Sequence, residues 1–201
     1  MYHLTDPAIR GNPFGAFDYK ISLYVDDVLL TFSDPAHSLP HVYATLLDFE
    51  GISRFKVNYE KSKILNLTLL DLETLSLCSA FHFKWAKQSI TYLGALISHL
   101  VSDLFRLNYL PCADSIRTLL SSWKPLLLSW TGHINAIKLS IMPRLLYLSQ
   151  ALPIWVDKAF LATIQRHLNH YIWQGKRPRL SHALMIQPRS VGGMEVPSVM
   201  H

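Results

Sequence analysis

The chain has 201 residues, half of them hydrophobic, so it is long enough for one sizeable core or two small ones and too apolar for disorder. Its two cysteines, Cys78 and Cys112, stand far apart with no cysteine beside either, which argues against a zinc cluster or a disulfide framework. Since neither an apolar N-terminal run nor a long apolar stretch occurs, we expect no membrane span, no secretion and an intracellular location, nuclear or cytoplasmic.

Charge is distributed unevenly between the two halves of the sequence. Residues 1–100 hold 8 Lys/Arg and 10 Asp/Glu, a net charge of −2, whereas residues 101–201 hold 11 and 4, a net charge of +7. Such a basic half is compatible with a polyanionic partner and equally with an ordinary solvated surface, so charge alone leaves both interpretations open.

The first predicted element is a β-hairpin over residues 20–32, because apolar residues alternate on both sides of Asp26 and Asp27. The Ser-Asp-Pro sequence that follows should end the second strand. Apolar residues then recur at helical spacing over about residues 39–49, which predicts an amphipathic helix that stops at Gly51. The local order is therefore strand, strand, helix.

Two further extended segments are expected in the first half. One covers residues 56–67, and the other covers residues 90–97, where Gly94 interrupts an apolar strand. Residues 68–84 carry an indistinct pattern that is compatible with another hairpin.

Apolar spacing becomes helical after about residue 112 and stays so, which predicts a bundle of three helices. We expect the boundary between the two regions near residues 98–112, where Pro111 stands and periodicity is lost. Pro143 should kink or divide the second helix, and Asp157 is placed to cap the third. The apolar positions are Ile116, Leu119, Leu120, Trp123 and Leu127 in the first helix, Ile134, Ile137, Ile141, Leu145 and Leu148 in the second, and Phe160, Ile164, Leu168 and Tyr171 in the third.

Asp26 and Asp27 are candidate ligands for Mg²⁺, because carboxylate oxygens hold the ions that bridge nucleotide phosphates during phosphoryl transfer. A hairpin tip would present such oxygens on a rigid support. Aspartate is also a common turn residue because its side chain bonds to nearby backbone, and for an isolated Asp-Asp pair this structural interpretation is the better one. The surrounding sequence therefore decides between the two.

The segments ISLYVDDVLLTFSDP and LLDFEGISRFKVNYEKSKIL together resemble the palm of LINE-type (non-LTR) retrotransposon reverse transcriptases. That family places an aromatic-x-Asp-Asp motif on a hairpin and continues with a helix, a glycine, an extended Lys-x-Asn segment and a Lys-Ser pair. Tyr92-Leu93-Gly94 is similar to the strand that positions the primer end. The matching residues after the hairpin are Gly51, Lys56, Asn58, Lys61 and Ser62.

The second half continues the resemblance, which runs from about residue 7 to residue 198. The segments LSWTGHINAIKLSIMPRLLYLSQALPI, YIWQGKRPRL and GGMEVP resemble the thumb and post-thumb region of the same elements. The resemblance implies an α+β fold in two domains. Residues 1–100 would form a partial polymerase palm with the YVDD hairpin, a helix, short antiparallel strands and a primer-grip-like strand, and residues 101–201 an all-α thumb and post-thumb bundle.

The resemblance implies an RNA-directed DNA polymerase, with an RNA template and a DNA primer as partners and Mg²⁺ as cofactor. It makes Asp26 the catalytic metal ligand, Asp27 its supporting neighbour and Tyr24 the residue beneath the primer terminus. Val25 stands where the family more usually has alanine, which implies an altered contact with the primer ribose.

Three further positions are implied to contact primer or nucleotide. Tyr92 and Gly94 belong to the primer-grip-like strand, and Lys61 is a candidate for assisting the leaving pyrophosphate, with an ordinary solvated lysine as its alternative.

The family carries another essential aspartate and the fingers, which bind the incoming nucleotide, upstream of the hairpin, whereas Asp6 to Arg10 matches a segment that follows these parts. The resemblance thus implies a truncated polymerase that is inactive alone and has an exposed palm strand edge available to a pairing partner. The alternatives are a residual non-catalytic nucleic-acid-binding fragment and a decayed element product without a biochemical role.

Lys176, Arg177 and Arg179 follow an aromatic helix end, and three cations within four residues can neutralise backbone phosphates, so we expect them to contact nucleic acid. The five tryptophans stand mostly at apolar helical positions and are expected in the core. The pairs His37/His41 and His167/His170 have no third ligand at a matching spacing, which favours ordinary surface histidines.

Overall fold

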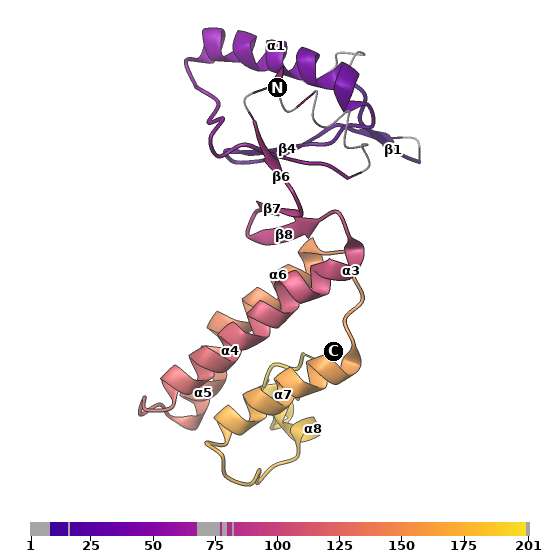
Figure 1. The fold of residues 1–201 in the computed structure, drawn as a ribbon. Coiled ribbons are helices and arrows are strands. Elements are labelled where there is room, and N and C mark those ends of the chain that lie inside the picture. Colours follow the sequence, from indigo (N-terminus) through magenta and orange to yellow (C-terminus); the bar gives the residue numbers. More distant parts are fainter. Residues whose placement is uncertain (1–8, 16, 68–76, 78–79, 82, 200–201) are drawn as a thin grey trace. The chain divides into compact units, whose positions relative to one another are not determined.

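The computed structural model describes residues 9–199 except residues 16, 68–76, 78–79 and 82 (Figure 1). The chain divides into two compact units, Met1–His99 and Leu100–His201. In the parts described, the first unit combines short strands with one long helix and the second is helical, so the predicted α+β class is confirmed. No helix within these described residues is long and apolar enough to cross a membrane.

The strands of the first unit form separate two-stranded sheets, not one continuous sheet. Three of these pairs are antiparallel, as expected, and a fourth pair is parallel. A parallel pair cannot be closed by a tight turn, so its strands stand well apart in the sequence. The antiparallel pairs are β1 (Asn12–Phe14) with β2 (Phe17–Tyr19), β3 (Ile21–Tyr24) with β4 (Asp27–Leu30), and β7 (Ser89–Tyr92) with β8 (Ala95–Ser98); β5 (Lys63–Leu65) pairs with β6 (Lys84–Ala86) in parallel.

The hairpin predicted over residues 20–32 is confirmed as β3–β4. The strand predicted over residues 90–97 is instead the β7–β8 hairpin, because Leu93 and Gly94 both take a positive φ, of 49° and 88°, as a two-residue type I′ turn requires. The strand expected over residues 56–67 is limited to β5. The further hairpin compatible with residues 68–84 lies largely outside the described residues.

Helix α1 (Pro35–Ser53) begins earlier and ends later than predicted. Asp34 caps its first turn, where the side chain accepts a hydrogen bond of 3.3 Å from the His37 backbone N–H. Gly51 lies within the helix and does not stop it. Arg54 takes the left-handed conformation at the C-terminal end with a φ of 62°. The helix therefore ends at an arginine, whereas the sequence predicted an end at Gly51.

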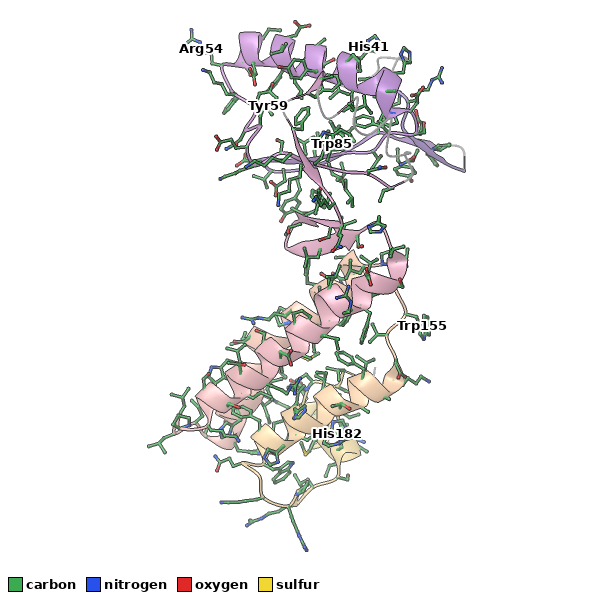
Figure 2. The ribbon with its side chains drawn as sticks, viewed as in Figure 1. His41, Arg54, Tyr59, Trp85, Trp155 and His182 are labelled. Carbon is green, nitrogen blue, oxygen red and sulfur yellow. The ribbon has the colours of Figure 1, made fainter. Side chains whose placement is uncertain are left out.

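Only the first half of α1 buries its apolar face. Leu39 and Val42 are buried, whereas Phe49 is 45% exposed. Tyr43 anchors the middle of the helix, because its ring contacts the rings of Tyr59 and Phe83, with centroids 6.0 and 6.5 Å away. Figure 2 shows Tyr59 beneath α1 and Arg54 at the end of the helix. The first unit therefore has an aromatic core of modest size.

The second unit consists of three long helical stretches and a short C-terminal helical segment. Asp157 caps the third stretch as predicted, because its side chain accepts a hydrogen bond of 3.1 Å from the Ala159 backbone N–H. The stretches are α3 (Val101–Leu104), η1 (Phe105–Tyr109) and α4 (Leu110–Trp123); α5 (Trp130–Ala136), η2 (Ile137–Ile141) and α6 (Met142–Ala151); and α7 (Lys158–Ile172), which is followed by α8 (His182–Met185) and the 3₁₀ turn η3 (Arg189–Val191).

Each of the first two stretches contains a π turn that is followed closely by a proline. η1 ends two residues before Pro111, and η2 ends two residues before Pro143. Proline lacks an N–H group, and its ring crowds the carbonyl four residues earlier, so a wider turn accommodates it. Residues 101–112, where the sequence suggested lost periodicity, are therefore helical. Pro143 changes the type of helix without ending it.

The core of the second unit lies between these stretches. All five apolar positions predicted for the second helix are buried, whereas Leu127, assigned to the first helix, is fully exposed because α4 ends at Trp123. Trp123, Trp130 and Trp173 pack against this core, as expected. Trp155 is the exception, since it is 93% exposed and projects from the chain between α6 and α7 (Figure 2).

Candidate catalytic turn and cationic groove

Asp26 and Asp27 stand at the tip of the β3–β4 hairpin, as predicted. Val25 and Asp26 form the two-residue turn, and Tyr24 and Asp27 face each other as the last paired residues of the two strands. All four residues are exposed. The hairpin therefore presents the whole motif to solvent at one point of the first unit.

Val25 takes a φ of 52°, a conformation that suits glycine and disfavours a β-branched side chain. Such a conformation costs about 1–3 kcal/mol and persists only where neighbouring structure holds it. Here the register of β3 with β4 fixes the turn at two residues, so the strain falls on its first residue.

Substitution of Val25 by glycine should relieve this strain and stabilise the hairpin by about 1 kcal/mol after the larger unfolded-state entropy of glycine is subtracted. The measurement is amide hydrogen exchange of the β3–β4 strands, which should become slower. Val28→Gly is the matched control, because Val28 lies within β4 and gains nothing from positive φ, so its exchange should become faster. Faster exchange in both variants would contradict the assignment of strain to Val25.

The two carboxylates make no hydrogen bond or ion pair with any of the residues that the structure describes, so their oxygens are available to a ligand. In donor chemistry they fit Mg²⁺, which is bound in nucleotide sites by one or two carboxylates together with water and phosphate oxygens. Within the described residues, no group of three acids, histidines or cysteines gathers around them. The pair therefore suits one ion held jointly with a substrate and lacks donors for a second ion.

Lys61 belongs to a turn that Asn58 organises. The Lys61 backbone N–H donates to the Asn58 side-chain oxygen at 3.1 Å, and the Ser62 hydroxyl donates to the Asn58 carbonyl at 2.8 Å. This turn leads into β5 and leaves the Lys61 side chain exposed. The Lys-x-Asn and Lys-Ser pattern thus has a structural role of its own, and no contact recorded for the described residues joins Lys61 to Asp26 or Asp27.

Tyr92 and Gly94 lie at the tip of the β7–β8 hairpin, where Tyr92 pairs with Ala95 across the turn. Gly94 is exposed. The Tyr92 hydroxyl is buried and has no hydrogen-bond partner in the described part of the chain. A buried hydroxyl cannot reach a primer, so a contact by Tyr92 would have to use the ring or follow a change in its surroundings.

Lys176, Arg177 and Arg179 belong to the second unit and follow α7. The helix ends in a Schellman motif, in which the Gly175 N–H donates to the His170 carbonyl at 2.9 Å and the Gln174 N–H to the Tyr171 carbonyl at 3.0 Å. Gln174 and Gly175 both have positive φ, of 51° and 73°. The motif turns the chain sharply, and Lys176 and Pro178 then line a groove together with residues of α7.

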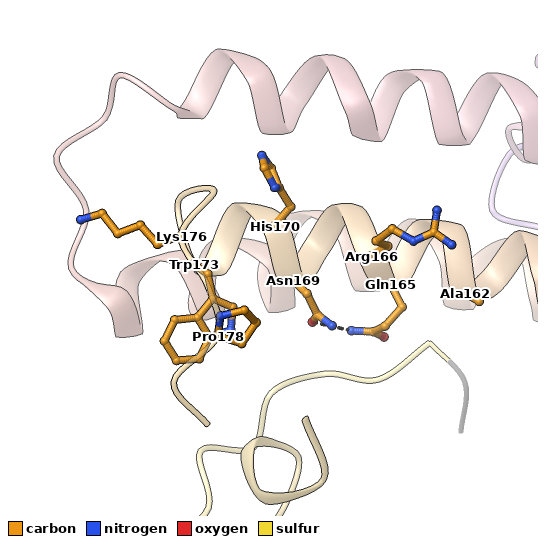
Figure 3. Close-up of a pocket in the computed structure, with 8 residues that line it drawn as sticks. All are labelled: Ala162, Gln165, Arg166, Asn169, His170, Trp173, Lys176 and Pro178. Carbon is orange, nitrogen blue, oxygen red and sulfur yellow. Dashed lines mark hydrogen bonds between the residues drawn. The ribbon is translucent and has the colours of Figure 1, made fainter. Parts of the chain in front are cut away.

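An open groove of about 450 Å³ results between the helix and the returning chain (Figure 3). Arg166 and His170 stand one turn apart on α7, and Trp173 lies at the helix end. Because a Cβ on Gly175 would lie 3.3 Å from the His170 ring, that ring rests against the turn. The lining residues are Ala162, Gln165, Arg166, Asn169, His170, Trp173, Lys176 and Pro178.

The groove is strongly cationic, because no aspartate or glutamate occurs between Asp157 and Glu195. Both of these acids are engaged elsewhere: Asp157 caps α7, and Glu195 lies 3.6 Å from Lys138 and 3.8 Å from Arg189. Burial lowers the pKa of His167, which follows Arg166 on α7, and Coulombic interactions with Arg117, Arg166 and His170 lower that pKa further. The local potential therefore favours an anion.

Of the three cations that the sequence singled out, Lys176 lines the groove, and Arg166 and His170, which the sequence did not single out as candidate contacts, line it as well. His170 was expected to be an ordinary surface histidine, and Trp173 was expected in the core, where one side of it does pack, 5.5 Å between ring centroids from Trp130. The acid-free stretch between Asp157 and Glu195 was the available signal for the wider cationic site.

No protein family model matches the chain. The Transposon TX1 uncharacterized 149 kDa protein of Xenopus laevis is 27% identical to it over 184 residues, which cover 88% of this chain. The chain spans 13% of the length of that protein. It is therefore similar, over most of its length, to a small part of a transposon protein.

Proposed function

We propose that the chain is part of the RNA-directed DNA polymerase of a LINE-type transposon, and that it contributes the catalytic aspartate pair. The observation that carries the proposal is the exposed Tyr24-Val25-Asp26-Asp27 turn, whose carboxylates have no partner among the described residues. The order of the motifs that follow it and the similarity to a transposon protein support the same conclusion.

In this proposal Asp26 and Asp27 hold one Mg²⁺ together with the substrate phosphates. The ion would supply electrostatic stabilisation of the charge that develops during phosphoryl transfer. Tyr24, which precedes the turn on β3, supports the primer end. RNA template and DNA primer are the partners that this function requires.

Polymerase chemistry of this kind uses two ions about 3.5–4 Å apart, and two adjacent carboxylates in one turn cannot place both. A further carboxylate, which we propose to lie on a separate strand, is therefore required. β3 and β4 pair only with each other in the described structure, which leaves an outer edge on each for such a strand. The 201-residue chain by itself is thus expected to be inactive.

The test is primer extension on an RNA template by the chain alone and by the chain fused, upstream of Tyr2, to a reverse transcriptase fingers segment that carries the additional aspartate. Template-dependent incorporation by the fusion alone would support the proposal. Incorporation by the short chain would support the polymerase function and refute the requirement for another carboxylate. No incorporation by a correctly folded fusion would overturn the polymerase function.

A second candidate function is nucleic-acid binding without catalysis, which the acid-free stretch of the second unit favours. Salt-sensitive binding of primer-template by the chain, combined with an inactive fusion, is the result that would select it.

A further inference from the structure

The α7 groove combines two kinds of surface that the proposed catalytic turn does not use. Arg166 and Lys176 supply cationic groups, His170 supplies an imidazole that can donate a hydrogen bond, and Trp173 and Pro178 supply an apolar wall. In Figure 3 Trp173 and Pro178 lie at the end of α7, and Arg166 and His170 project from successive turns of the helix. A ligand that fills the groove should therefore carry both negative charge and a flat apolar group.

The C-terminal end of α7 does not repel an anionic ligand. The C-terminus of a helix carries partial negative charge on its unbonded carbonyl groups, which would repel an anion. Here the Schellman motif engages the carbonyls of His170 and Tyr171, and the Trp173 carbonyl accepts a hydrogen bond of 2.9 Å from the Lys176 N–H. The cations of the groove consequently determine its local potential.

An aromatic wall beside cations suits single-stranded nucleic acid better than duplex. The bases of a duplex are stacked and paired, so their faces cannot reach an aromatic ring, whereas an unpaired base can stack on one. The Trp173 ring contacts the Trp130 ring, with centroids 5.5 Å apart and the ring planes tilted by 49°, and Trp173 also lines the groove. A volume of about 450 Å³ is within the range of small-ligand pockets and leaves room for one base and its phosphates.

We propose that the α7 groove binds single-stranded nucleic acid, with phosphates on Arg166, His170 and Lys176 and one unpaired base against Trp173 and Pro178. This inference rests on the proposed function, and it specifies that the second unit binds the nucleic acid where it is single-stranded and not where it is a duplex. It differs from the polymerase proposal in requiring neither Asp26 nor a divalent ion.

The experiment is fluorescence anisotropy of the full 201-residue chain with a labelled single-stranded oligonucleotide of about 12 nucleotides, and with the matching duplex. The double variant Arg166→Ala/Lys176→Ala should bind the single strand about tenfold or more weakly at about 0.1 M salt. Its slope of log affinity against log salt should become shallower by about 1.4, since each neutralised phosphate of a single strand contributes about 0.7.

Lys124→Ala/Lys158→Ala is the matched control, because it removes the same charge from the same unit at two residues that do not line the groove. It should weaken binding by no more than about twofold. Trp173→Leu should weaken binding about fivefold or more, whereas Trp173→Phe should largely preserve it, because a phenylalanine ring still offers a stacking face. Thermal melts of both Trp173 variants establish that they are folded.

An equal loss in the groove variant and the control would overturn the proposal, since it would indicate a general electrostatic attraction. Tighter binding of the duplex than of the single strand would overturn it as well. So would binding of phosphatidylserine vesicles without binding of either oligonucleotide, which would make the groove a membrane-surface site. Because binding is measured without catalysis, a failed primer-extension assay leaves this test unaffected.

Discussion

Replacement of Ile137 by alanine is expected to destabilise the second unit by about 2–5 kcal/mol, a substantial part of the roughly 5–15 kcal/mol that stabilises a typical domain. Ile137 is fully buried and lies in η2, between two further buried isoleucines, Ile134 and Ile141. Removal of its side chain leaves a cavity that flanking helices can fill only in part. The measurement is denaturant unfolding followed by the fluorescence of the core tryptophans.

Leu139→Ala is the matched control, because Leu139 lies in the same π turn and is 79% exposed. It should change the free energy of unfolding by no more than about 0.5 kcal/mol. A comparable loss of stability in the two variants would show that the π turn does not orient Ile137 into the core as described.

Replacement of Asp26 by asparagine should reduce primer extension by the fingers-fused protein at least about 100-fold, because a metal ligand at a transition state contributes several kcal/mol. Asparagine keeps the size of the side chain and removes its charge, so the exposed turn should keep its conformation. The readout is the single-turnover rate of nucleotide incorporation at saturating Mg²⁺, together with affinity for primer-template, which should not change.

Asp27→Asn serves as the comparison within the same turn. Asp27 already belongs to β4 and pairs with Tyr24, and as the supporting neighbour it should lose less activity than Asp26. Equal activity of the Asp26 variant and the unmodified fusion would remove the catalytic role from this turn. A larger loss in the Asp27 variant would exchange the roles of the two carboxylates.

The elements that the sequence predicted correctly depend on local patterns. Alternation around Asp26 defined the β3–β4 hairpin, and the spacing from Ile134 to Leu148 defined a buried helical face. The parallel pairing of β5 with β6 was not predictable in this way, because their register depends on contacts between distant segments. The end of α1 was also missed, since Gly51 is tolerated inside the helix and Arg54 adopts the left-handed conformation.

The same contrast between local patterns and the three-dimensional path of the chain applies to the candidate site. The candidate catalytic turn could be located from four consecutive residues, because a two-residue hairpin fixes the positions of these residues relative to one another. The α7 groove could not be located in this way, since Lys176 and Pro178 line it together with α7 only after Gln174 and Gly175 reverse the chain. The sequence offers the cationic cluster of Lys176, Arg177 and Arg179 and a stretch without acids, and these features predict a charge without predicting a shape.

The two π turns affect how related sequences should be compared with this one. A helix that contains a π turn holds one residue more than an α-helix joining the same end points, so each turn behaves as a one-residue insertion that the helix has absorbed. A relative without the proline at position 111 or 143 could dispense with the extra residue. Its later residues would keep their places in the core only if the alignment opened a single gap within Phe105–Tyr109 or Ile137–Ile141. An ungapped alignment would rotate every following position by about 100° around the helix axis and would pair core residues with surface residues.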